Sequence, residues 1–130
     1  MTQEPPAAAA APARRGRLTR AAEFDAVTGL GRSIAGRYLT LRFREAEGGT
    51  LPRVGFAVPR KVGGAVERNA VKRRLREAVD RNEELLQPAT DYVFIARAGV
   101  YEVLDTQGFG WLSEQVGELL RSASERPSGR

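Results

Sequence analysis

The chain has 130 residues, 42% of them hydrophobic, which is enough to build one compact domain with a core. It has no cysteine and no histidine, which excludes disulfides and thiol catalysis, argues against a zinc site and removes the usual general base of hydrolases. The net charge is +5 and the pI about 10.4, and all but two of the 21 basic residues are arginines, whose side chain forks onto phosphate and stacks on bases.

Both ends of the chain differ in composition from the middle. Residues 1–16 are rich in alanine and proline and lack spaced apolar residues, so we expect a disordered tail there and another over residues 122–130. The start lacks the charged-then-apolar order of a signal peptide, and no apolar run approaches the roughly 20 residues of a membrane span. We therefore expect a cytoplasmic protein whose folded domain covers residues 17–121.

The first half of this domain predicts one helix and two strands. Residues 19–31 (TRAAEFDAVTGLG) have apolar side chains at helical spacing before a final glycine. Residues 37–44 (RYLTLRFR) and 53–58 (RVGFAV) alternate between inward apolar side chains and outward ones, which is typical of half-buried strands. A turn is expected between them over residues 45–52.

The second half predicts a strong helix, a central strand and a final helix. Residues 63–86 begin with a glycine pair and carry an apolar stripe. The stripe consists of Val71, Leu75, Ala78 and Val79. Residues 91–97 (DYVFIAR) are almost continuously apolar, and residues 103–123 end as a helix whose start is left open by Gly108 and Gly110. The order α-β-β-α-β-α predicts an α+β fold, a small α-β sandwich with helices on a short mixed sheet.

The positive charge is concentrated in one segment. Residues 53–81 hold nine basic and three acidic side chains, a net charge of +6. The rest of the chain holds twelve basic and thirteen acidic side chains, a net charge of −1. A local excess of this kind is the electrostatic footprint of a surface that binds a polyanion.

Within the strong helix, the basic residues share one side. Residues three and four apart lie on the same face, so Arg68, Lys72 and Arg76 line one ridge, with Asn69 and Arg73 beside it. Arginine and lysine bind phosphates, and asparagine can reach a sugar hydroxyl or a base edge. The alternative is a solvated face, but such faces usually mix both signs, and three acidic residues are too few to neutralise this ridge. We therefore favour nucleic-acid binding.

Further candidate contacts lie outside this helix. A second basic group precedes the first helix and consists of Arg14, Arg15, Arg17 and Arg20. This group either binds nucleic acid or belongs to a flexible tail that only aids solubility. Phe24 and Tyr38 are aromatics that could stack on unpaired bases, although for Phe24 the helical spacing favours a core contact. Phe109 and Trp111 are assigned to the core.

No catalytic motif is present in the sequence. There is no GxxxxGK[ST] phosphate loop, and KVGGAVER is not the GxxG clamp of KH domains. None of the carboxylates is marked as a metal ligand or as one half of an acid–base pair. We expect a chain that binds nucleic acid without catalytic residues of its own.

The segment RVGFAVPRKVGGAVERNAVKRRLREAV resembles the signature of the bacterial ribonuclease P protein component. That signature has a V-G-x-x-V strand, a basic pair, G-x-A-V, and then R-N-x-x-K-R-x-x-R-[EQ] on a helix. RLTRAAEFDAV near the start and the strand DYVFIAR match the same family in order and spacing. The resemblance covers about residues 17–121 and combines several separated motifs.

The resemblance implies a fold and a function. Ribonuclease P removes the 5′ leader of precursor tRNA by hydrolysing one phosphodiester bond, and in bacteria a large RNA is the catalyst and holds the magnesium ions. The protein is expected to bind that RNA and the leader, to bind no cofactor itself, and to have no membrane partner and no obligate protein partner. The implied fold is an α-β sandwich whose basic helix joins two parallel strands by a left-handed crossover, against the usual right-handed rule.

The family motifs also imply roles for individual residues. The basic helix motif, which is expected to bind the catalytic RNA, falls on Arg68, Asn69, Lys72, Arg73 and Arg76. Basic positions ahead of the two helices fall on Arg60, Lys61, Arg17 and Arg20. The cleft that holds the single-stranded leader is expected to contain Phe24, Tyr38 and Arg42.

Three positions depart from the family pattern. Ala70 stands where an arginine is frequent, Thr28 where a second cleft aromatic is expected, and Arg42 at an aromatic position late in the first strand. These departures predict a less aromatic and more electrostatic leader cleft.

Two alternative functions stay open. One is a structural RNA-binding protein, such as a ribosome-associated factor. The other is a DNA-binding regulator that uses residues 66–81 as a recognition helix, although a helix-turn-helix would need another helix just before it.

Overall fold

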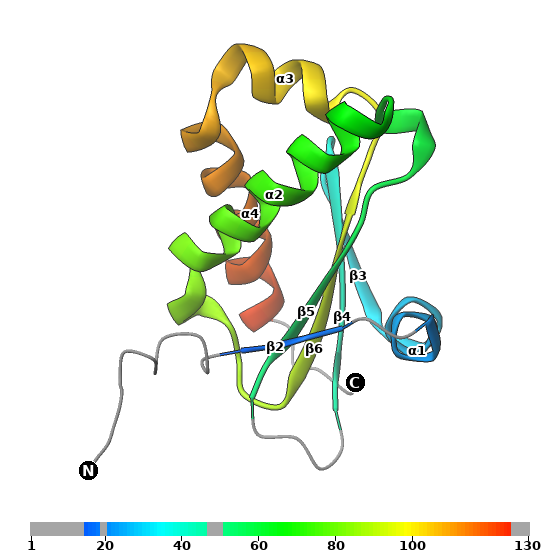
Figure 1. Cartoon of the computed structure of the whole chain (residues 1–130). Coiled ribbons are helices and arrows are strands. Elements are labelled where there is room, and N and C mark those ends of the chain that lie inside the picture. Colours follow the sequence, from blue (N-terminus) through cyan, green and yellow to red (C-terminus); the bar gives the residue numbers. More distant parts are fainter. Residues whose placement is uncertain (1–14, 19–20, 47–50, 126–130) are drawn as a thin grey trace, which may run out of the picture.

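A five-stranded sheet and four α-helices form the fold within the residues that the computed structural model describes, 15–18, 21–46 and 51–125 (Figure 1). The strands are β2 (Gly16–Arg17), β3 (Arg32–Ala35), β4 (Leu39–Glu45), β5 (Arg53–Ala57) and β6 (Thr90–Ala96). The helices are α1 (Ala21–Leu30), α2 (Ala65–Arg81), α3 (Val100–Gln107) and α4 (Phe109–Ser124). Two short 3₁₀ turns flank α2, namely η2 (Arg60–Val62) and η3 (Glu83–Leu85).

The sheet is mixed, as predicted, and β6 lies at its centre. The strand order is β2-β5-β6-β4-β3. β5 is parallel to both β2 and β6, whereas β4 is antiparallel to both β6 and β3. The helix α2 connects the parallel neighbours β5 and β6. In Figure 1 both strands run upward, β5 lies in front of β6 and α2 lies to their left, which gives this crossover the left hand that the resemblance implies.

Helices cover both faces of the sheet, which explains why β6 is almost continuously apolar. Figure 1 shows α2, α3 and α4 on one face and α1 on the other. Because side chains alternate along a strand, Tyr92, Phe94 and Ala96 of β6 belong to the larger core on the side of α2, α3 and α4. Val93 and Ile95 belong to a smaller core on the side of α1. That smaller core is completed by Leu18, Phe24 and Val27.

The strong helix predicted over residues 63–86 is present as α2, and its predicted apolar stripe is confirmed. The side chains buried in the larger core are Val71, Leu75, Ala78 and Val79. At the end of α2, the amide of Asn82 donates to the carbonyl of Ala78 at 2.8 Å and to that of Ser113 on α4 at 3.0 Å. The helix is therefore held between the sheet and α4 along its length and at its C-terminal end.

The order of elements corrects the predicted α-β-β-α-β-α in two respects. Two short strands, β2 with two residues and β3 with four, are added, because stretches of that length show no clear periodicity. The final predicted helix is two helices, because Gly108 has φ of 87° and turns the chain between α3 and α4.

The domain boundaries are also wider than predicted. Gly16 already belongs to β2, and α4 continues past residue 121 to Ser124. Residues 1–14 and 126–130 of the predicted tails, and residues 47–50 of the predicted turn, lie outside the described residues. None of the helices in the described ranges is long and apolar enough to cross a membrane.

Candidate nucleic-acid interface

The side of α2 that faces away from the core is cationic. Asn69, Arg73 and Arg76 are exposed, whereas Arg68 and Lys72 are half-buried. The helix therefore docks by one side and presents guanidinium, ammonium and amide groups on the other.

Two acidic side chains of α2 are already paired with arginines. Arg74 contacts Glu77 one turn away at 3.0 Å, and Asp80 contacts Arg15 from the N-terminal segment at 3.0 Å. Arg74 also lies over the ring of Phe109 on α4, 5.7 Å from its centroid. The two acidic residues in the C-terminal half of α2 are thus both paired.

The cations in the middle of α2 lack such partners. Within the described part of the chain, no acidic oxygen lies within the 4.0 Å of an ion pair from Lys72, Arg73 or Arg76. Arg68 donates from its Nε to the carbonyl of Gly63 at 3.2 Å and pairs with no acidic side chain among the residues described. These side chains keep their positive charge available for an anion.

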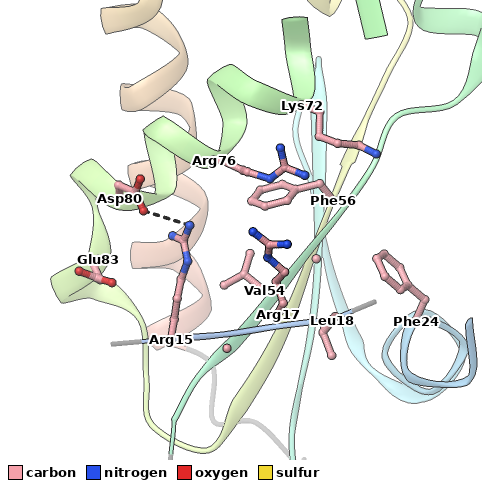
Figure 2. Close-up of a pocket in the computed structure, with 12 residues that line it drawn as sticks. Arg15, Arg17, Leu18, Phe24, Val54, Phe56, Lys72, Arg76, Asp80 and Glu83 are labelled. Carbon is pink, nitrogen blue, oxygen red and sulfur yellow. Dashed lines mark ion pairs between the residues drawn. The ribbon is translucent and has the colours of Figure 1, made fainter. Parts of the chain in front are cut away.

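A cleft of about 660 Å³ opens beside these cations, between α2, the edge of the sheet and α1 (Figure 2). Lys72 and Arg76 reach it from α2, and Arg17 reaches it from β2. Phe24 of α1 and Phe56 of β5 supply two aromatic rings. The fold thus brings residues from the start of the domain against a helix about fifty residues further along the chain.

Both aromatic rings serve the core and the cleft at once. Phe24 packs against the smaller core, so the core contact favoured by its spacing is present, and it also lines the cleft. Phe56 stacks on Phe94 of β6, with centroids 6.1 Å apart and ring planes at 18°, and it too lines the cleft. The alternation of residues 53–58 predicts Phe56 to point inward, but alternation cannot show that one face of its ring stays accessible.

The remaining predicted RNA contacts lie on the turn before α2, on the edge strand β2 or outside the described residues. Arg60 and Lys61 are exposed on η2, just before α2, and are anchored by the buried Val62 between them and the helix. Arg17 is exposed on β2. Arg20 lies outside the described residues.

Tyr38 and Arg42, which the resemblance leads us to expect in the leader cleft with Phe24, are not among the residues that line this cleft. The ring of Tyr38 packs edge-on against Trp111 of α4, with centroids 5.7 Å apart, on the face of the sheet that carries the larger core. Arg42 projects toward α1, where its guanidinium donates to the carbonyl of Thr28. Thr28 itself donates its hydroxyl to the carbonyl of Phe24 at 2.9 Å. Two of the three departures from the family pattern thus secure the end of α1.

The chemistry that this arrangement supports is binding. In the described ranges, no three acidic side chains gather into a group that could hold a metal ion. The cleft combines unpaired cations, which attract phosphates, with ring faces, on which unpaired bases stack. A single strand of nucleic acid has both of these features.

Comparison with known proteins identifies the family. The sequence model of the family described as Ribonuclease P matches residues 13–124. The ribonuclease P protein component of Chloroflexus aurantiacus is 40% identical over 112 residues, which cover 86% of this chain and 80% of that protein. The family match therefore spans nearly all of the described domain.

Solved structures agree with this match. The ribonuclease P protein of Thermotoga maritima superposes with a TM-score of 0.74 at 30% identity, covering 83% of this chain and 97% of that one. The ribonuclease P protein of Staphylococcus aureus superposes with a TM-score of 0.72 at 25% identity, covering 82% of this chain and 94% of that one. From sequence and fold together, this chain belongs to the family of bacterial ribonuclease P protein components.

Proposed function

We propose that this chain is the protein subunit of ribonuclease P and assists a catalytic RNA in removing the 5′ leader from precursor tRNA. Family membership supports this proposal, and so does the cleft, where Arg17, Lys72 and Arg76 converge with Phe24 and Phe56. Cations for phosphates and rings for bases are the two components of a site for one unpaired RNA strand. The convergence of these five side chains is the observation that carries the proposal.

The geometry supports a division of the predicted RNA contacts between two surfaces. The first is the outer surface, which we assign to the catalytic RNA; it consists of Arg60, Lys61, Arg68, Asn69 and Arg73. The second is the cleft, which we assign to the leader. Lys72 and Arg76 line the cleft from α2 and therefore stand at the border between the two RNAs.

We assign the chemistry to the RNA. Hydrolysis of the phosphodiester would use Mg²⁺ held by the RNA subunit, and the protein would supply no catalytic group. Its positive charges would lower the repulsion between two RNA backbones, because cationic side chains replace the counterions that each backbone otherwise needs. The pair of RNAs could then assemble at a lower magnesium concentration.

Cleavage of a precursor tRNA by a bacterial ribonuclease P RNA, at magnesium too low for the RNA alone, tests this proposal. We expect the protein to restore cleavage, and to do so more for a leader of several nucleotides than for a single-nucleotide leader, because only the longer one reaches the cleft. If the protein binds the RNA without any gain in cleavage, the alternative of a structural RNA-binding protein is favoured.

A DNA-binding regulator fits the fold less well. In the described residues before α2 lie β5 and the short turn η2, where a helix-turn-helix would need a helix. Tighter binding to a particular duplex DNA than to either RNA would nevertheless favour the regulator.

A further inference from the structure

Two residues of β5 are turned toward α1. Arg53 and Gly55 are two positions apart on a strand and so share the face opposite to the buried Val54. Arg53 places Nε and Nη2 on the two carboxylate oxygens of Asp91, at 2.9 and 2.8 Å, and Nη1 on Oε2 of Glu23, at 2.7 Å. One guanidinium therefore ties α1 to the two parallel strands beside the cleft.

Gly55 provides the surface on which Phe24 rests. A Cβ at this position would lie 2.6 Å from Cζ of Phe24 and 2.9 Å from Cβ of Leu18, closer than real contacts allow. The ring of Phe24 therefore reaches its place in the cleft only because β5 has no side chain there. Glu23, which Arg53 holds, is the residue directly before Phe24.

Besides the contact with Arg53, the described part of α1 is held by Phe24 and Val27 in the smaller core. Among its side chains that the structure describes, only Val27 is buried. Arg42 holds the carbonyl of Thr28 at the far end of the helix. The side chain of Asp91 is 8% exposed and accepts from two nitrogens of Arg53, and this hydrogen bonding is the main cause that raises the pKa of Arg53. The guanidinium thus remains charged and fixed, and can orient Glu23.

We propose that Arg53 and Gly55 are positioning residues: together they seat α1 so that the Phe24 ring stands across the cleft from Lys72 and Arg76, at a spacing that admits one unpaired RNA strand. This inference rests on the proposed function, because it concerns how the same cleft selects its ligand. The contact of Arg53 with Glu23 sets the position of the helix, and the bare backbone of Gly55 sets how closely the ring approaches the strand.

The test uses the full-length protein and a short unstructured RNA, with binding measured directly on the protein. Glu23→Ala removes the contact of α1 with Arg53 while leaving the pair of Arg53 and the buried Asp91 intact, so the charge of Asp91 keeps its partner. Asp25→Ala is the matched control, because it removes the same charge from an exposed position of the same helix. We expect Glu23→Ala to bind the RNA about tenfold more weakly than Asp25→Ala, the size of one lost stacking contact. Affinity for the ribonuclease P RNA should be the same in both variants.

A coupling measurement separates positioning from a general loss of stability. In a Phe24→Ala background, Glu23→Ala should cause no further loss, because the ring that it positions is already absent. Gly55→Ala should weaken binding of the short RNA by a similar factor. Glu23→Gln should bind it as the wild type does, since the amide oxygen of the glutamine still accepts from Arg53. The inference is overturned if Glu23→Ala binds as tightly as Asp25→Ala, or if its loss is undiminished without Phe24. If the wild-type protein neither binds the short RNA nor aids cleavage, the proposed function itself fails.

Discussion

At the scale of single residues, the charges of α2 differ in what they contact. Arg74 pairs with Glu77 and, like Arg81, lies over the ring of Phe109, where its stem also covers apolar surface. Lys72 and Arg76 instead line the cleft and have no ion-pair partner within the described residues. The number of arginines in a segment therefore overstates how many of them are available to an RNA backbone.

This difference predicts the salt dependence of RNA binding. Replacing Lys72 and Arg76 with alanine should flatten the slope of log affinity against log salt by about 0.7 per lost phosphate contact for a single-stranded RNA. Arg74→Ala, which removes a charge from a paired position of the same helix, is the control and should change the slope much less. Equal slopes for the double variant and the wild type would mean that the cleft cations face only water.

Tyr92 predicts an alkaline change in stability. Burial raises the pKa of Tyr92, against the opposing effect of the backbone N–H of Gln87, which donates to its hydroxyl at 2.9 Å. Because the folded pKa is above the unfolded value, the stability contributed by the neutral phenol is complete below about pH 10 and is lost as the pH rises through the folded pKa. Tyr92→Phe should cost about 1 kcal/mol at pH 8 through the lost hydrogen bond, and the gap to wild type should narrow toward pH 11. Urea unfolding of both proteins at pH 8 and pH 11 is the measurement. The same difference in free energy of unfolding at both pH values would contradict this prediction.

At the scale of the elements, the break between α3 and α4 depends on one glycine. Gly108 has φ of 87°, a conformation that other residues adopt only with strain, and a Cβ there would meet no atom within 4 Å. The cost of a side chain at this position is therefore one of backbone conformation alone.

Two alanine substitutions, two positions apart, should have opposite effects. Gly108→Ala should destabilise the fold by about 1–2 kcal/mol. Gly110→Ala, on α4 and equally free of neighbours, should be neutral or stabilising by up to about 1 kcal/mol. Urea denaturation of both variants is the measurement, and effects of the same sign would contradict this account of the break.

Length and pattern decide which elements the sequence could show. The helix α2 is predictable, because it is 17 residues long, carries an apolar stripe from Val71 to Val79 and follows a glycine pair. β6 is predictable as a central strand, because both of its faces are apolar. β2 has only two residues and exists through its pairing with β5, so no local pattern could indicate it.

At the scale of the whole molecule, the cleft exists because the N-terminal segment folds back along β5. The backbone N–H of Gly16 donates to Pro52 at 2.7 Å, and that of Leu18 donates to Val54 at 3.1 Å. These two bonds hold Arg17 between them at the cleft. The cleft thus depends on tertiary pairing between two distant parts of the chain.

For the same reason, the site could be predicted only in part. The charge tally and helical spacing identify the cations of α2, and the resemblance adds Phe24. Spacing could not place Tyr38 outside the cleft or Phe56 inside it, because these depend on which face of the sheet each strand turns toward α2. The role of Arg53 also depends on three-dimensional contacts, since its partners are 30 and 38 residues away.

The magnesium dependence of single-turnover precursor-tRNA cleavage tests the central claim most directly, namely that this protein assists an RNA catalyst through its cationic cleft. The assay uses three samples: the ribonuclease P RNA alone, the RNA with saturating wild-type protein, and the RNA with a saturating amount of the variant that carries both Lys72→Ala and Arg76→Ala. We predict that the wild-type protein moves the half-maximal magnesium concentration well below that of the RNA alone and that the double variant loses much of this shift. A half-maximal magnesium concentration that the wild-type protein leaves unchanged would contradict the account.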